Sequence, residues 1–387
     1  MKIVSVLGAT GSVGLNTLKL LQNSKQNFKV LALTANSNYK ILSKFAKILN
    51  AQYAVIADVE YLPKLKVALK DTTIKCLAGQ DSIIKVATLK TDIIFSAIVG
   101  MAGLKPTIWA LRNTKVLAIA NKECLVSAGN ILISQAKKYN TKILPLDSEH
   151  NAIFQVIDNN NVNEIKEVIL TASGGPFWQK NKKQFKNISV REALIHPNWK
   201  MGKKITVDSS TLMNKFLEVV EAAILFKLDL KKVKILIHPD SLIHGIVNFI
   251  DGTSILIASK PDMKIPINYA LHWPIRKKNK FSNLDLAKIE KLVFYKPDLE
   301  KFPALKLIRY LYNNKFYECK LIVINAANEI AVKNFLEKKL NYLDIVNLIK
   351  KTLNNFKHRV VKSLNDVIVI DNEARKVANK LLNNWYN

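Results

Sequence analysis

Short apolar runs alternate with segments of helical periodicity along the first half of the chain. Six apolar runs predict strands: residues 2–8, 28–35, 53–57, 91–98, 115–120 and 141–146. Apolar residues recur every three or four positions in segments 15–24 and 39–50, which predicts helices between the first three strands. Strands that are apolar throughout and joined by helices favour a mostly parallel sheet covered on both faces. We therefore predict an α/β fold for this half.

The pattern changes after about Glu164. Three alternating or hairpin-like runs predict a largely antiparallel sheet: residues 167–177, 234–250 and 253–259. Because residues 210–226 have helical spacing, this part reads as a central α+β domain. Residues 273–300 are polar and rich in Lys and Asn, which indicates a linker, and the chain from about Phe302 onward predicts helices. We expect four segments: 1–147, 148–272, a linker at 273–300, and a C-terminal α-helical domain at 301–387.

Composition limits the classes of protein that the chain can belong to. Of the 387 residues, 49% are hydrophobic, which is enough for a sizeable core and excludes global disorder. Three cysteines without CxxC spacing argue for a reducing compartment and against a disulfide framework. No apolar run reaches the roughly 18 residues that a membrane helix needs, and a strand begins at Lys2 where a signal peptide would lie. We expect a cytoplasmic protein without a membrane partner.

The net charge of +29, from 59 basic and 30 acidic residues, first suggests a nucleic-acid partner. The lysines, however, are spread over the whole length, and the sequence has no zinc-finger spacing, RNP motif or basic arm. We attribute the charge to compositional drift and a preference for small anionic molecules. No nucleic-acid partner is expected.

The glycine-rich stretch GATGSVG, Gly8 to Gly14, follows one predicted strand and opens a helix. Glycines in this context allow a tight turn and the close approach of a pyrophosphate, which the helix N-terminus then binds. A purely structural turn is the simpler alternative. We favour a Rossmann-like sheet with a dinucleotide site. No acid follows the second strand, where Asn36, Ser37 and Asn38 stand, so NADPH is favoured over NADH.

Two carboxylates stand close together in LPLDSEHNAIFQ, residues 144–155. In an extended chain Asp147 and Glu149 would point to the same side. Two such charges share a proton or bind a cation, and oxygen ligands suit Mg²⁺ or Mn²⁺. The alternative is a solvated loop that caps a helix start. The stretch alone leaves both interpretations open.

Further polar residues gather in four stretches: ANKE at 120–123, ASGGPF at 172–177, HPNWKMG at 196–202 and VDSSTLMNKFLEVVEA at 207–222. Each has an ordinary explanation: Ser209 as a helix cap, Lys215 as a solvated charge, Trp199 as a packing residue. Together they supply the Ser, Asn, Lys and His that bind a phosphate and a third carboxylate for a cation.

These stretches, with PDMK at 261–264 and INAANEIAV at 324–332, run in the order of one family. The chain resembles the 1-deoxy-D-xylulose 5-phosphate reductoisomerases over nearly its full length. The resemblance implies an oxidoreductase of non-mevalonate isoprenoid biosynthesis. With NADPH and Mg²⁺ or Mn²⁺, such an enzyme rearranges and reduces 1-deoxy-D-xylulose 5-phosphate to 2-C-methyl-D-erythritol 4-phosphate. It further implies a homodimer, with an NADPH-binding domain at 1–147 and a catalytic, metal- and substrate-binding domain at 148–272.

The resemblance also implies a role for individual residues. The NADPH contacts would be Thr10, Gly11, Ser12, Val13, Asn36, Ser37, Asn38, Asn121, Glu123 and Gly202. The metal ligands would be Asp147, Glu149 and Glu218. The substrate phosphate would be bound by Ser173, His196, Ser209, Asn214 and Lys215. Lys122 and Ser148 would bind the hydroxyl and carbonyl oxygens of the substrate, and Trp199 and Met201 would belong to a closing lid.

Four positions depart from the family pattern: Phe216, Lys200, Asp240 and Lys260. None is an implied ligand, but Phe216 stands where glycine is usual, beside Lys215. A binding protein that kept the fold and lost the chemistry is the alternative from another class.

Overall fold

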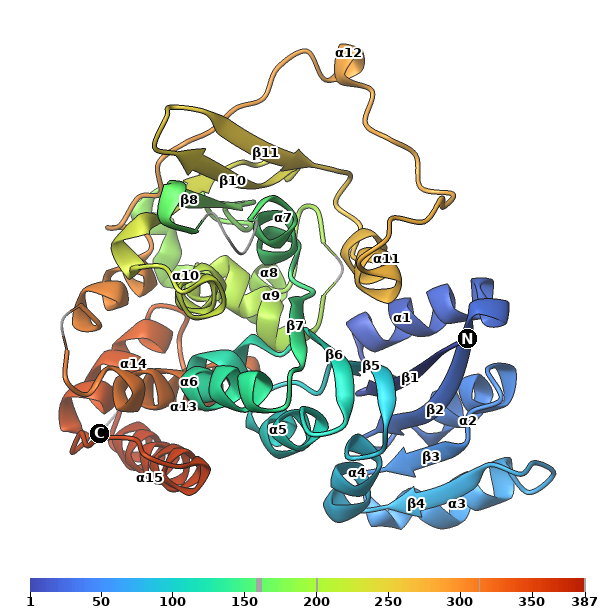
Figure 1. The fold of residues 1–387 in the computed structure, drawn as a ribbon. Helices are drawn as coiled ribbons and strands as arrows, with labels where there is room; N and C mark the ends of the chain where they lie inside the picture. Colours follow the sequence, from blue (N-terminus) through green and yellow to red (C-terminus); the bar gives the residue numbers. More distant parts are fainter. Residues whose placement is uncertain (158–161, 200, 313, 386–387) are drawn as a thin grey trace. The chain divides into compact units, whose positions relative to one another are not determined.

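The structure is a computed structural model that describes residues 1–157, 162–199, 201–312 and 314–385 (Figure 1). The chain forms two compact units, each built from separated segments. The first comprises residues 1–124, 132–154 and 262–282, and the second comprises residues 125–131, 155–261 and 283–387. The predicted boundaries after residues 147, 272 and 300 divide the chain by function, and they stay a prediction.

The first unit is built on a seven-stranded parallel sheet with the strand order β4-β3-β2-β1-β5-β6-β7. Its strands are β1 Lys2–Leu7, β2 Phe28–Ala35, β3 Tyr53–Ile56, β4 Lys75–Ala78, β5 Thr91–Ser96, β6 Thr114–Ile119 and β7 Lys142–Pro145. The helices are α1 Ser12–Asn23, α2 Tyr39–Ile48, α3 Leu62–Ala68, α4 Gln80–Ala87, α5 Leu104–Ala110, α6 Lys122–Lys138, α7 Ser148–Val156 and α11 Lys264–His272. The middle of α6 and the end of α7 belong to the second unit. The predicted parallel sheet is confirmed.

Alternation along β2 explains why apolar residues occupy successive positions of this strand. Leu33 joins a large hydrophobic cluster that also contains residues of α1 and α2, whereas the preceding Ala32 joins a smaller cluster with Ile83 and Val86 of α4. Successive strand side chains point to opposite faces, so both faces of this strand are covered by helices. Every strand of such a sheet ends at the same edge, and the residues that follow the strands are gathered there.

The second unit contains a four-stranded sheet with the order β11-β10-β8-β9, in which only β8 and β9 are parallel. Its strands are β8 Ile165–Ala172, β9 Val233–Ile237, β10 Ile243–Phe249 and β11 Ser254–Ala258. The helices are α8 Val190–Ala193, α9 Lys203–Ser210, α10 Met213–Phe226, α12 Leu286–Ile289, α13 Tyr317–Leu336, α14 Asp344–Asn355 and α15 Leu364–Asn383. The predicted, largely antiparallel sheet is thus confirmed.

The C-terminal part is helical, as predicted. The long helix α13 packs against α14, α15 and α9. Helix α15 begins with a capping box, in which Ser363 Oγ accepts a hydrogen bond from the Asp366 backbone N–H at 3.2 Å. Within the described residues, no helix is long and apolar enough to cross a membrane.

Candidate active site

The glycine-rich turn of the first unit connects β1 to α1. Gly8 has a φ of +83°, which disfavours any side chain. A Cβ on Gly14 would lie 2.3 Å from the carbonyl oxygen of Gly8, so the helix start and the turn are in direct contact. Helix α1 begins at Ser12 without an acidic residue in its first turn. Its N–H groups and positive dipole end therefore form a surface suited to a phosphate.

The turn after β2 carries no carboxylate. Asn36 and Asn38 are exposed, and Asn38 Oδ1 caps α2 by accepting a hydrogen bond from the Ile41 N–H at 3.1 Å. The Asp58 backbone N–H donates to Asn36 O at 3.0 Å, but the Asp58 carboxylate accepts from the Glu60 N–H at 3.1 Å. The groups nearest a ribose 2′-position in such a fold are thus polar and uncharged.

The carboxyl ends of β6 and β7 are joined by an ion pair, in which Lys122 Nζ lies 2.5 Å from Asp147 Oδ2. Lys122 is 3% exposed and occupies the first turn of α6 beside the buried Glu123. The preceding Asn121 is the N-cap, because its Oδ1 accepts from the Cys124 N–H at 3.1 Å and its Nδ2 donates to Gly100 O at 2.8 Å. Its side chain thus stabilises the loop after β5.

One argument from the sequence is wrong. Helix α7 begins at Ser148, so Glu149 lies in its first turn, and the side chains of Asp147 and Glu149 do not follow an extended chain. Ser148 Oγ donates to Glu149 Oε2 at 2.6 Å. Both carboxylates therefore lie at the start of this helix, and whether they bind a cation stays a prediction.

In the second unit, β8 ends in a glycine turn. Gly174 and Gly175 have φ values of +84° and +67°, and the Gly175 N–H donates to Ser173 Oγ at 3.2 Å. A Cβ on Gly175 would lie 2.8 Å from Ser209 O, so this turn lies against the end of α9. Only glycine permits both the backbone conformation and the close approach.

His196 links the two serines that were predicted to bind phosphate. Its Nδ1 accepts hydrogen bonds from the backbone N–H groups of Asn198 at 3.2 Å and Trp199 at 3.0 Å. Nδ1 is therefore unprotonated, which assigns the proton to Nε2. Nε2 lies 3.1 Å from both Ser173 Oγ and Ser209 Oγ. Three donors from separate segments thus meet at one point.

Helix α10 carries the remaining predicted residues of this unit. Asn214 Nδ2 and Lys215 Nζ both bond to the carboxylate of Glu218, and Lys215 Nζ also donates to Thr171 O at 2.6 Å. Lys215 is 3% and Glu218 1% exposed, so a solvated charge is the wrong description of Lys215. The helix starts after Leu212, whose φ of +57° is strained for a branched side chain.

The predicted lid residues lie between His196 and α9. The Trp199 ring packs edge-on against His244 with centroids 6.2 Å apart, Met201 is half-buried, and Gly202 is the exposed N-cap of α9. Lys200 lies outside the described residues.

The other departures from the family pattern have different surroundings. Phe216 is fully buried within α10, and Asp240 and Lys260 are exposed.

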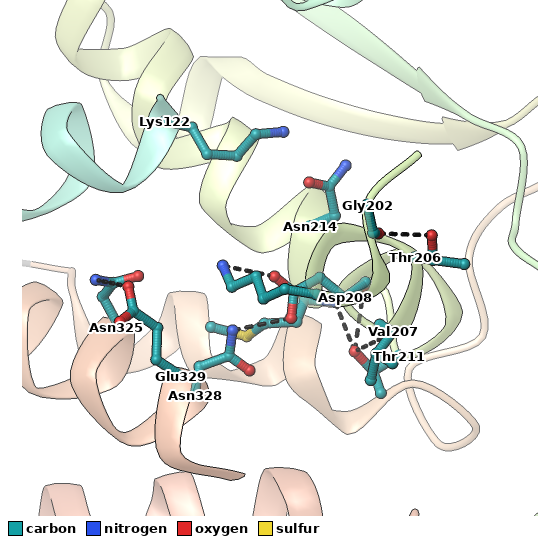
Figure 2. Close-up of polar contacts among 12 residues, drawn as sticks. Lys122, Gly202, Thr206, Val207, Asp208, Thr211, Asn214, Asn325, Asn328 and Glu329 are labelled. Carbon is teal, nitrogen blue, oxygen red and sulfur yellow. Dashed lines mark hydrogen bonds and ion pairs between the residues drawn. The ribbon is translucent and has the colours of Figure 1, made fainter. Parts of the chain in front are cut away.

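The sequence analysis missed polar residues of the second unit that surround Ser209. Asp208 is 1% exposed, pairs with Lys204 at 2.8 Å and accepts a hydrogen bond from Asn328 of α13 at 2.9 Å (Figure 2). Tyr342 Oη donates to Ser210 O at 2.6 Å. The i, i+4 spacing of Lys204 and Asp208 was a readable signal.

The predicted residues thus form two groups. Lys122, Asp147, Ser148 and Glu149 belong to the first unit with the glycine-rich turn, and Ser173, His196, Ser209, Asn214, Lys215 and Glu218 belong to the second. A parallel sheet with a glycine-rich turn after its first strand, combined with a separate unit that gathers Ser, His, Asn and Lys side chains, is typical of dinucleotide-dependent oxidoreductases.

Comparisons with known proteins identify the family. Family models of 1-deoxy-D-xylulose 5-phosphate reductoisomerase match residues 4–129, and models of its C-terminal domains match residues 143–226 and 258–377. The chain belongs to the 1-deoxy-D-xylulose 5-phosphate reductoisomerase family.

Individual relatives match over the full length. The reductoisomerase of Wolbachia pipientis subsp. Culex pipiens is 46% identical, with 99% of this chain and 98% of the relative covered. The crystal structure of the Zymomonas mobilis reductoisomerase with NADPH is similar at a TM-score of 0.92 and 43% identity, covering 98% of this chain and 99% of that one. A reductoisomerase structure with NADPH, fosmidomycin and magnesium has the same TM-score at 37% identity, covering 99% and 98%.

Proposed function

We propose that the chain converts 1-deoxy-D-xylulose 5-phosphate to 2-C-methyl-D-erythritol 4-phosphate with NADPH and a divalent cation. The observation that carries the proposal is the cluster around His196 Nε2, which lies 3.1 Å from two serine hydroxyls. Such a cluster has the donors that a phosphate requires. Because this cluster occurs in a chain that matches the family over its full length, the phosphate is assigned to the family's substrate.

The residues present fit a dinucleotide. The contact of Gly14 with Gly8 leaves no room for a side chain, and no acid stands in the first turn of α1 to repel a pyrophosphate. Thr10, Gly11, Ser12 and Val13 bind the pyrophosphate, and the turn from Asn36 to Asn38 binds the adenosine ribose. Asn121, Glu123 and Gly202 complete the cofactor contacts. A nicotinamide cofactor held by these residues would supply a hydride for the reduction.

The donor set also fits a hard cation. Asp147, Glu149 and Glu218 offer only carboxylate oxygens, which suit Mg²⁺ and also Mn²⁺. Glu218 is buried and balanced by Lys215, as expected for a carboxylate whose charge needs a partner. A cation held by these carboxylates would supply Lewis-acid stabilisation to the substrate.

The side chains of this protein orient the substrate. Ser173, Ser209 and Asn214 donate to its phosphate together with the Nε2–H of His196, and Lys215 supplies the positive charge. Lys122 and Ser148 bind the hydroxyl and carbonyl oxygens. The phosphate lies away from the reacting carbons, so its binding energy can draw Trp199 and Met201 over the substrate and exclude water.

The protein acts as a cytoplasmic homodimer. Support for a dimer comes from β11, an edge strand whose Ile255 and Leu256 are 42% and 43% exposed. An apolar edge strand of this kind pairs readily with a second copy of itself. Sedimentation equilibrium tests this assembly, and a monomer at micromolar concentration would contradict it.

The decisive experiment follows NADPH oxidation in four mixtures: complete, without substrate, without divalent cation, and with NADH in place of NADPH. We expect full turnover in the complete mixture with Mg²⁺ or Mn²⁺, a much lower rate with NADH, and no turnover without substrate or without the divalent cation. A protein that binds NADPH and the substrate but gives no oxidation would be the alternative, a binding protein that kept the fold.

A further inference from the structure

The peptide that carries Ser209 is bonded on both sides by residues of the C-terminal part of the second unit. Asp208 Oδ1 accepts a hydrogen bond from Asn328 Nδ2 at 2.9 Å. Ser210 O accepts one from Tyr342 Oη at 2.6 Å. These partners come from residues 120 and 132 positions away, so neither bond is a local feature of the turn.

The Asn328 side of this arrangement is deeply buried. Asn328 is fully buried on α13, and Figure 2 shows its amide directed at Asp208 of α9. The carboxylate of Asp208 also pairs with Lys204 one helical turn earlier, at 2.8 Å. A buried carboxylate keeps a fixed position when both a cation and an amide hold it. The hydrogen bond from Asn328 therefore fixes how α9 is turned about its own axis relative to α13.

The Tyr342 side is equally rigid. Its ring packs edge-on against Phe177, Phe185 and Phe335, with centroids 5.4 to 6.0 Å apart. Burial raises the pKa of Tyr342 far above its usual range, so the hydroxyl remains a donor at every working pH. Ser210 is the last residue of α9, where backbone carbonyls lack partners within the helix. Tyr342 supplies the missing donor.

The opposite side of the same peptide is fixed by the glycine turn. A Cβ on Gly175 would lie 2.8 Å from Ser209 O and 3.1 Å from the Cα of Ser210. The left-handed Leu212 then ends the segment and persists only when its surroundings hold it. Ser209 is thus held between the turn that carries Ser173 and the C-terminal helices.

We propose that Asn328 and Tyr342 are positioning residues, which hold Ser209 where its hydroxyl meets His196 and the substrate phosphate. This inference rests on the proposed phosphate-binding role of Ser209. Through these two bonds the C-terminal helices set the affinity for substrate without contacting it.

The test compares Tyr342→Phe and Asn328→Leu, each of which removes one donor and keeps the side-chain size. Net loss of one hydrogen bond should raise the substrate KM roughly 2- to 12-fold in each variant. The affinity for NADPH should stay unchanged, and inhibition by inorganic phosphate should weaken in parallel with KM. Thr352→Val is the matched control, because the buried Thr352 Oγ1 donates to Leu348 O at 2.8 Å on α14, away from Ser209.

A double-mutant cycle separates positioning from general destabilisation. If Tyr342 acts through Ser209, Tyr342→Phe should no longer change KM in a Ser209→Ala background. Persistence of the full KM effect in that background would overturn the inference. So would KM values for Tyr342→Phe and Asn328→Leu that match those of Thr352→Val.

The Ser209→Ala variant alone tests the underlying role. An unchanged KM in Ser209→Ala would remove the phosphate role of Ser209, and the positioning role would fall with it. If Ser209→Ala raised the KM while Tyr342→Phe and Asn328→Leu left it unchanged, the phosphate role of Ser209 would stand and only the positioning role would be rejected. Urea unfolding of each variant confirms that the second unit, which contains all these residues, is folded.

Discussion

Lys215→Met is the substitution that separates phosphate binding from stability most clearly. The side chain is 4% exposed, and its Nζ bonds to Thr171 O at 2.6 Å and to the buried carboxylate of Glu218. Methionine preserves the length and the apolar stem of the side chain and removes only the charge and its donors. Two losses are expected, one from the proposed contact with the substrate phosphate and one from the ion pair with Glu218.

We expect the loss of substrate affinity to come from the proposed charge-assisted hydrogen bond between Lys215 and the phosphate. Such a bond contributes about 1.5–3 kcal/mol, which corresponds to a KM raised roughly 10- to 150-fold. The loss of stability comes from Glu218, which is left buried without its cation and costs about 3–5 kcal/mol of unfolding free energy. The double variant Lys215→Met/Glu218→Gln should recover much of that stability but none of the substrate affinity.

The assay measures KM for the substrate by NADPH oxidation, NADPH affinity by titration and unfolding free energy in urea. Lys115→Met serves as the control, since Lys115 pairs with Asp92 at 2.8 Å but is 77% exposed. Water screens an exposed pair and leaves it little net contribution to stability, so this variant should behave as the parent protein. If Lys215→Met lost stability as expected but kept its substrate KM, Lys215 would be a structural counterion of Glu218 and no phosphate ligand.

Further predictions concern the cofactor and the cation. Asn36→Asp should narrow the preference for NADPH over NADH, because a carboxylate at this turn repels a 2′-phosphate and accepts from ribose hydroxyls; equal cofactor ratios before and after would contradict it. Gly14→Ala should abolish NADPH binding or folding, since its Cβ would lie 2.3 Å from Gly8 O. If this variant bound NADPH with the affinity of the parent protein, the close contact would not be essential for the site. Glu149→Gln should weaken activation by Mg²⁺ and regain part of its rate in excess Mn²⁺. Ser148→Ala should instead raise the substrate KM and leave the dependence of the rate on metal unchanged. Metal titrations of both variants distinguish the two roles.

The strands of the first unit were readable because their signal is local. The apolar run at 28–35 coincides with β2, since both faces of that strand are covered and its residues from Val30 onward are apolar or small, whereas Lys29 near its start is exposed. Strand β4, Lys75–Ala78, escaped notice because its four residues KCLA begin with an exposed lysine at the edge of the sheet. The other edge strand, β7, also has four residues, but two of them are buried and its apolar run was readable, whereas no residue of β4 is buried.

The geometry of the candidate site was less accessible to the sequence. The extended arrangement of Asp147 and Glu149 was wrong, because the residues that suggested a ligand pair are also good helix-start residues, and α7 begins at Ser148. Motif order could name Ser209 and His196 through the family resemblance. It could not show that the Nδ1 of His196 is occupied by two backbone N–H groups, which determines the proton on Nε2.

A signal for one of the two positioning residues, Asn328, was nevertheless present in the sequence. Helix α13 reads LIVINAANEIAV, and its Asn325 and Asn328 stand among apolar residues with no exposed face. An amide in such a helix must find a hydrogen-bond partner or lose about 1–3 kcal/mol. The sequence therefore predicts a polar partner for this amide in another segment. An acid such as Asp208, which stands four residues after Lys204, is a candidate for that partner. Only the packing of α13 against α9 shows which acid it is.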